Sequence, residues 1–297
     1  MACTGHYFYA IDYRTMECKH VIVPTDFSET ADRALEYARA LFRSDTCSFH
    51  LLNTYTPAIS HSRFMATSLH GSVLEESVQN ASEQGLQELV ASLHKKNANP
   101  LHTFKTISSF NILTEEICNL SEVNDIRLVV TGTTGESALK DVFLGSNTVR
   151  ILNSAQECPV LTIPPEASFA PPKQIAFITD YKRNFSAIVL QPLLDIASTY
   201  GSKIRVMHIK EEQELSKYQQ SNKSILEEYL SSVSYTLHEM PYYGSKSKVI
   251  QHFLEDMEVD MVSLVHYKHS FLEEILREPV IKKVIFHTKT PILVLPE

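Results

Sequence analysis

The sequence is poor in glycine and lacks the features of membrane-spanning and exported proteins. Glycine accounts for only 8 of its 297 residues. No stretch approaches the roughly 18 consecutive apolar residues of a membrane span, and residues 1–18 lack the basic and apolar regions of a secretion signal. The five cysteines are odd in number and show no CxxC spacing, which fits reduced thiols. These absences predict a cytoplasmic protein that does not act in a membrane.

The chain also lacks the charge of a nucleic-acid-binding protein. Its formal net charge is -8 and its pI about 5.9, without a dense run of lysine and arginine. This balance argues against nucleic acid or an anionic membrane as the main partner. With 297 residues and 43% hydrophobic composition, the chain is long enough for two domains of ordinary size.

Three of the eight glycines lie in one loop, in a G-x2-G-x9-G spacing formed by Gly132, Gly135 and Gly145. The loop follows an apolar strand at 128–131, and Ser146 starts a segment that can open a helix. Glycine permits positive φ and a close approach of the backbone to a ligand. The N–H groups at a helix start attract anions, and the Ser146 and Thr148 hydroxyls add donors. The spacing predicts a phosphate-binding loop; the alternative is a tight turn before a capped helix.

The two halves of the chain repeat each other. The strand pattern and Thr-Asp-aromatic ending of residues 19–27 recur at 173–181, an offset of 154, and the pattern of 158–164 recurs at 290–296. The segment 164–172 between them is rich in proline. We therefore expect an N-terminal extension at 1–18 and two domains at 19–165 and 173–297.

Each half is expected to be an α/β domain, because strands alternate with helical patterns. Strands are predicted at about 20–25, 47–53, 103–108, 127–131 and 159–163, and again at 174–179, 203–208, 234–238, 260–265 and 291–295. Helices are predicted after Ser28 and at about 72–95, 184–200 and 211–232. The prediction is two repeated, open, parallel five-stranded sheets flanked by helices, Rossmann-like in type. Such sheets bind ligands at the carboxyl ends of their strands.

Three segments together make the chain resemble the universal stress protein family. They are Pro24-Thr25-Asp26-Phe27-Ser28, the glycine loop, and the closing strand Cys158-Pro159-Val160-Leu161. The resemblance spans nearly the whole chain beyond residue 18 and is more specific in the first half. It implies an adenine nucleotide alpha hydrolase-like fold in a tandem form, and ATP binding, which is found in members with the glycine motif.

The resemblance also implies a set of site residues. Pro24, Thr25 and Asp26 would line the nucleoside pocket, and Thr54 would offer its backbone to the adenine. The phosphates would be surrounded by Thr131, Gly132, Thr134, Gly135, Gly145, Ser146, Asn147 and Thr148. For Asp26 the alternative is a helix-entry residue that binds backbone N–H groups. Glu136 departs from the expected chemistry, because its carboxylate would oppose phosphate unless it points to solvent or Mg²⁺ lies between them.

The second half departs further from the motif. An ungapped alignment puts Leu264, Tyr267, Arg277 and Glu278 against Gly132, Gly135, Gly145 and Ser146. Without glycine the backbone cannot approach phosphate in the same way, so we expect ATP in the first domain only, although Asp180 remains. His266 and His269 are spaced as a ligand pair, but no further ligand completes a metal set.

The resulting expectation is an ATP-binding stress protein that acts as a nucleotide-dependent switch or sensor. In the family, single domains commonly dimerise through their last strand, so 160–163 and 292–295 would pair here in an intramolecular pseudo-dimer. The sequence leaves protein partners and a further homodimer open. Two alternatives are a nucleotide-independent interaction protein and a slow ATPase or adenine-nucleotide enzyme. No Walker, HxGH, SGGxDS or GxSxG motif is present, so at most weak ATP hydrolysis and no catalytic residue are expected.

Overall fold

The computed structural model describes residues 18–55, 70–95, 99–134, 145–153, 158–212, 214–266 and 289–296. Within the range 70–95, side chains are described from residue 76 onward. The predicted Gly135 and Glu136, and Tyr267, His269, Arg277 and Glu278, lie outside these ranges. So does the expected N-terminal extension up to residue 17.

The described strands form one ten-stranded sheet in which both halves have the same strand order. In the first half the order is β3-β2-β1-β4-β5, and in the second β8-β7-β6-β9-β10. The strands of the first half are β1 (Lys19–Pro24), β2 (Cys47–Thr54), β3 (His102–Ser109), β4 (Ile126–Gly132) and β5 (Val160–Ile163). Those of the second half are β6 (Gln174–Ile178), β7 (Lys203–Lys210), β8 (Ser234–Pro241), β9 (Met261–Val265) and β10 (Ile292–Leu295).

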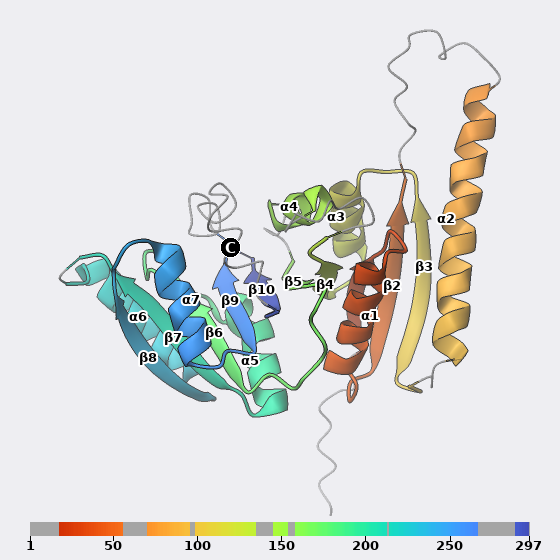
Figure 1. Cartoon of the computed structure of the whole chain (residues 1–297). Coiled ribbons are helices and arrows are strands. Elements are labelled where there is room, and N and C mark those ends of the chain that lie inside the picture. Colours follow the sequence, from red (N-terminus) through yellow and green to blue (C-terminus); the bar gives the residue numbers. More distant parts are fainter. Residues whose placement is uncertain are drawn as a thin grey trace, which may run out of the picture.

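The two halves join at the centre of this sheet (Figure 1), where β5 and β10 pair antiparallel. Leu161 is opposite Leu293, and Val160 is opposite Val294. All other neighbouring strands pair in parallel. The expected pairing of the last strands within one chain is therefore present. Parallel sheets need helices on both faces, which fits the apolar character of the strands.

Helices cover both faces of the sheet, and each face has one core that runs through both halves. One core includes apolar residues of α1 (Glu29–Leu41), α2 (His70–Lys95), α5 (Ala187–Tyr200) and α6 (Lys217–Leu230). The other includes residues of α3 (Leu113–Val123), α4 (Ser146–Asn153) and α7 (Lys246–Asp256). The structure is thus a helix–sheet–helix sandwich.

The helix starts follow local capping. Ser28 caps α1 by accepting a hydrogen bond from the Ala31 N–H, as expected. The helix expected over 211–232 is shorter, because β7 continues to Lys210 and a capping box between Ser216 and Gln219 starts α6 at Lys217. The structure adds α3 and α7, each 11 residues long, to the helices predicted from the sequence.

A linker aromatic ring joins helices of the two halves. Phe169 packs edge-on against Tyr37 of α1, with ring centroids 5.2 Å apart, and against Tyr200 of α5, with centroids 5.9 Å apart. The Tyr200 hydroxyl donates a hydrogen bond to the Leu41 carbonyl. The linker therefore takes part in the contact between the halves.

We expect Phe169→Ala to lower the free energy of unfolding by about 1–2 kcal/mol, because two aromatic contacts and partly buried apolar area are lost. Urea unfolding followed by circular dichroism measures the change. The neighbouring exposed Ser168 offers the control Ser168→Ala, which should leave stability nearly unchanged. Equal stability of the two variants would contradict a role for the linker ring in joining the halves.

Candidate functional site

The predicted site residues come together at the carboxyl ends of β1, β2 and β4. Of the twelve, Gly135 lies outside the described residues, and the other eleven all line one cavity of about 130 Å³. They are Pro24, Thr25, Asp26, Thr54, Thr131, Gly132, Thr134, Gly145, Ser146, Asn147 and Thr148. Four lining residues were not predicted, namely Ala31, Leu52, Asn53 and Leu113.

A tight turn after β1 sets the position of Asp26. The Thr25 hydroxyl accepts a hydrogen bond from the Phe27 N–H at 3.0 Å, and an Asp26 carboxylate oxygen accepts one from the Ser28 N–H at 3.1 Å. Phe27 has a positive φ of 63°, which is unusual for a non-glycine residue. Asp26 therefore binds a backbone N–H at the helix entry, as the alternative interpretation proposed, while its exposed side chain also lines the cavity.

Asn53 supports this turn from the neighbouring strand. Its side-chain amide donates a 2.7 Å hydrogen bond to the Thr25 carbonyl. On this strand the sequence predicts Thr54 as the site residue instead. The available signal was the position of Asn53 directly after the buried Leu52, at the carboxyl end of a strand. No comparable sequence signal marks Leu113, the first residue of α3, as a lining residue.

The loop threonines have structural roles that the sequence analysis did not anticipate. The Thr148 hydroxyl is buried and donates to the Gly132 carbonyl at 2.8 Å, and the Thr131 hydroxyl donates to the same carbonyl at 3.3 Å. In this structure the Thr148 hydroxyl hydrogen is thus directed to the Gly132 carbonyl, although Thr148 also lines the cavity. The Thr148 side chain therefore ties the start of α4 to the end of β4, whereas the Thr131 bond is local to the end of β4.

The start of α4 is the part of the cavity best suited to an anion. The Gly145 N–H bonds the Thr133 carbonyl at 2.7 Å, and the Val149 N–H bonds the Gly145 carbonyl at 3.0 Å. The N–H groups of the first turn, at residues 146–148, have no partner within the helix. Ser146 and Asn147 are exposed. These donors, with the positive end of the helix dipole, form an environment that favours negative charge.

Gly132 is needed for packing rather than for an unusual φ. Its φ is not positive, which corrects the expectation that glycine serves here for backbone freedom. An ideal Cβ on Gly132 would lie 2.6 Å from the Thr30 Cγ2 and 3.1 Å from the Thr30 carbonyl oxygen. The absent side chain lets the end of β4 lie against the first turn of α1.

The turn after β1 has a close copy in the second half. The Thr179 hydroxyl accepts from the Tyr181 N–H at 3.0 Å, and Asp180 accepts from the Lys182 N–H at 2.8 Å. Tyr181 has a φ of 57°. The His208 ring bonds the Thr179 carbonyl at 3.1 Å, in the place of Asn53. The repeat found in the sequence thus extends to individual hydrogen bonds.

The glycine loop has no such copy among the described residues. The strand register corrects the ungapped alignment by one residue. Gly132 pairs with Ile163, and Leu295, the counterpart of Ile163 in the second half, pairs with Val265. Val265, rather than Leu264, therefore takes the place of Gly132. His269 lies outside the described part, and within that part no group of three or more His, Cys, Asp or Glu side chains could hold a metal. Nor is any described helix long and apolar enough to cross a membrane.

Comparisons with known proteins agree with this architecture. Residues 17–164 match the universal stress protein family. A universal stress protein of Methanocaldococcus jannaschii is 25% identical over 153 residues, which are 49% of this chain and 94% of the relative. A universal stress protein structure from Archaeoglobus fulgidus has a TM-score of 0.64 at 16% identity, covering 95% of this chain and 97% of its own. A structure from Pseudomonas aeruginosa has a TM-score of 0.54 at 13% identity, covering 95% of this chain and 94% of its own. The chain therefore belongs to the universal stress protein family, with the family's fold repeated in both halves.

Proposed function

We propose that this protein binds ATP in its first half and acts as a nucleotide-dependent module of a stress response. The observation that carries the proposal is the convergence of eleven predicted residues on the cavity at the start of α4. We take 19–165 as the ATP-binding domain and 173–297 as a second domain that pairs with it as a pseudo-dimer.

The chemistry of the cavity fits the separate parts of the nucleotide. The Thr25–Asp26 turn and Thr54 would contact the nucleoside, and the N–H groups of residues 146–148 would contact phosphate. The volume of about 130 Å³ is below the roughly 300 Å³ of a typical ligand pocket. Only part of the nucleotide would therefore lie inside the cavity, with the rest along its open rim. Asp26 is the single ionisable residue among the described residues that line the cavity.

Asn147 offers a direct test of the phosphate position. We expect Asn147→Glu to weaken ATP binding by at least about tenfold, because it adds a carboxylate beside the phosphates. An acidic residue in the first turn of a helix favours folding, so the variant should remain folded. Isothermal titration of ATP, with and without Mg²⁺, measures the affinity and should give a stoichiometry near one for the unmodified chain.

Asn147→Gln is the matched control, since it differs from Asn147→Glu only in charge. It should bind ATP nearly as well as the unmodified protein. Equal binding by both variants would place the phosphates elsewhere. No binding by the folded unmodified protein would favour a nucleotide-independent interaction protein, in which the side chains of Asp26 and Thr148 serve to stabilise the β1 turn and the start of α4. Phosphate release over many turnovers would instead favour an ATPase.

A further inference from the structure

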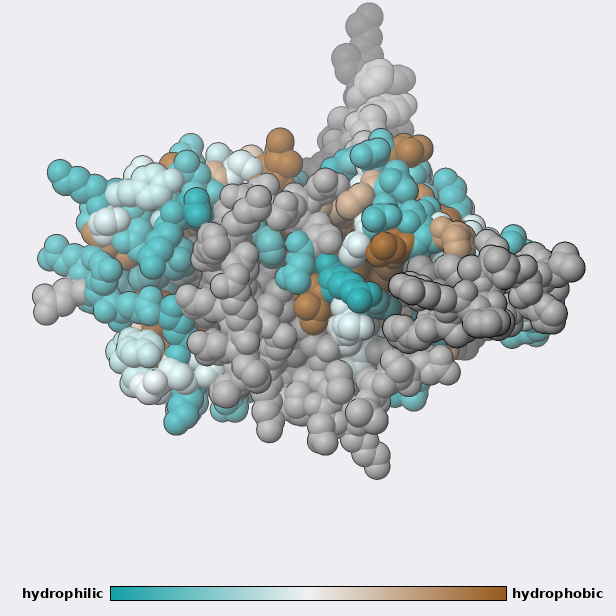
Figure 2. All heavy atoms as spheres, turned by 90° about the horizontal axis from the view of Figure 1, so that it is seen from above, coloured by the Kyte–Doolittle hydropathy of each residue, from teal (hydrophilic) through white to brown (hydrophobic). Residues whose placement is uncertain are grey.

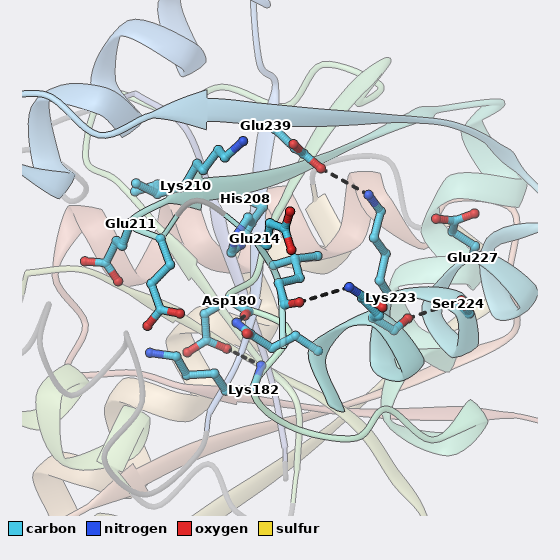
Figure 3. Close-up of a pocket in the computed structure, with 15 residues that line it drawn as sticks. Asp180, Lys182, His208, Lys210, Glu211, Glu214, Lys223, Ser224, Glu227 and Glu239 are labelled. Carbon is cyan, nitrogen blue, oxygen red and sulfur yellow. Dashed lines mark hydrogen bonds and ion pairs between the residues drawn. The ribbon is translucent and has the colours of Figure 1, made fainter. Parts of the chain in front are cut away.

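The second half contains a larger cavity that the glycine motif does not explain. Its volume is about 610 Å³, within the usual range for small-molecule sites. It begins at Asp180, the counterpart of Asp26, and extends past the end of β7 to the side of α6 (Figure 3). Seen from above, the described surface over this half is mainly hydrophilic (Figure 2).

Carboxylates dominate the lining of this cavity. Six of them line it: Asp180, Glu211, Glu212, Glu214, Glu227 and Glu239. Only three lysines do so: Lys182, Lys210 and Lys223. The lining therefore carries three more negative than positive charges, and a cavity of one predominant sign attracts ligands of the opposite sign.

Ion pairing among the described residues leaves most of this negative charge unmatched. Lys223 pairs with Glu239 at 3.2 Å, and Lys246, from outside the cavity, pairs with Glu211 at 3.2 Å. Asp180, Glu212, Glu214 and Glu227 form no ion pair with another described residue. Burial, with the charges of Glu227 and Glu239, raises the pKa of the Tyr181 hydroxyl far above its usual value. Tyr181, which follows the lining residue Asp180, therefore also experiences the charges of Glu227 and Glu239.

His208 adds a buried hydrogen-bond acceptor to the cavity wall. Its side chain is only 7% exposed. Because a carbonyl oxygen can only accept, the 3.1 Å bond to the Thr179 carbonyl requires the hydrogen on Nδ1. In the neutral ring Nε2 is then an acceptor, and no described residue bonds to it. A ligand N–H group can therefore be received at this position.

We propose that this cavity binds a linear polyamine. Its ammonium groups would be held by the separated carboxylates and donate to the His208 Nε2. The described carboxylates do not converge on a metal-binding geometry, so a ligand with several spaced positive charges fits better than a single metal ion. A nucleotide polyphosphate would be repelled by the same charges. The two halves would then bind ligands of opposite charge.

The test is isothermal titration of spermidine into the full chain without ATP. We expect binding near one per chain that Glu227→Gln weakens about fivefold or more, through loss of a charge-assisted contact. Glu228→Gln is the matched control, because Glu228 is the next residue of α6 and does not line the cavity. It makes the same change in net charge and should leave the affinity nearly unchanged.

Lys210→Gln tests whether the cavity favours positively charged ligands. Removing this exposed cation, which forms no ion pair with another described residue, should strengthen spermidine binding about twofold to threefold. The proposal is overturned if spermidine does not bind, or if Glu227→Gln and Glu228→Gln weaken it equally, which would indicate general attraction to an acidic protein. It is also overturned if triphosphate binds and Lys210→Gln weakens that binding. None of these results depends on ATP binding in the first half.

Discussion

Replacing Gly132 by alanine is expected to lower the free energy of unfolding by about 2 kcal/mol, a typical cost for overpacking a closely packed position. The new Cβ would lie 2.6 Å from the Thr30 Cγ2, closer than real Cβ atoms approach a neighbour. The Thr30 carbonyl oxygen, at 3.1 Å, leaves little room on the backbone side. The end of β4 and the first turn of α1 must therefore separate. Urea unfolding followed by circular dichroism measures the loss.

A double-mutant cycle with Thr30→Ser isolates the contact responsible. Serine lacks the Cγ2 methyl group, so it removes the shortest contact while keeping a hydroxyl near Thr134, which lies 3.4 Å from the Thr30 hydroxyl. We expect Thr30→Ser to recover about half of the stability lost in Gly132→Ala. Strictly additive effects would show that the two positions do not interact and that the cost of alanine has another origin.

The position equivalent to Gly132 in the second half carries a side chain, and the later start of the following helix explains why it fits. Val265 replaces Gly132 there, according to the strand register. In the first half α1 begins at Glu29, four residues after Thr25; in the second, α5 begins at Ala187, eight residues after Thr179. The helix turn that contacts Gly132 therefore has no counterpart directly after Asp180. The early start of α1 therefore accounts for the glycine at position 132.

Much of the fold could be predicted because its signals are local. Apolar strands ending in Thr-Asp-aromatic marked both β1 and β6, and the turns they form match bond for bond. Ala34, Leu35 and Ala38 recur at helical spacing in the sequence and form part of the buried face of α1. Such patterns are visible because a helix places residues three and four apart on one face, and a strand buried on both faces reads as a continuous apolar run.

The remaining features depend on contacts between distant segments. The one-residue shift that replaces Leu264 by Val265 appears only in the pairing of strands. The role of the Thr148 hydroxyl depends on where the Gly132 carbonyl lies, 16 residues away. The acidic cavity combines Asp180 with residues of β7, α6 and β8, none of which forms a recognisable motif. Sequence spacing contains no direct information on these distances.

The stability of the protein should fall by up to about 3 kcal/mol as the pH drops from about 6.5 to 4, because of His50. His50 is buried in β2, and burial, Lys105 and His20 together lower its pKa to about 4. In the unfolded chain the pKa is about 6.5. Between these values the unfolded chain binds a proton that the folded chain does not, so acidification favours unfolding. Urea unfolding at a series of pH values, followed by circular dichroism because the chain has no tryptophan, measures the slope.

The neighbours of His50 explain why it resists protonation. Its Nε2 lies 2.9 Å from the Nδ1 of His20, so one nitrogen donates and the other must accept. Protonation would place a positive charge on the buried His50 ring, and Lys105 lies opposite His50 on β3, so the two charges would repel each other. His50→Gln should lower stability at pH 7 but flatten its decline on acidification. Phe169→Ala, which also lowers stability but removes no titratable group, should keep the slope of the unmodified protein. If His50→Gln also kept that slope, the acid sensitivity would belong to other groups, and the buried histidine pair would be a packing contact alone.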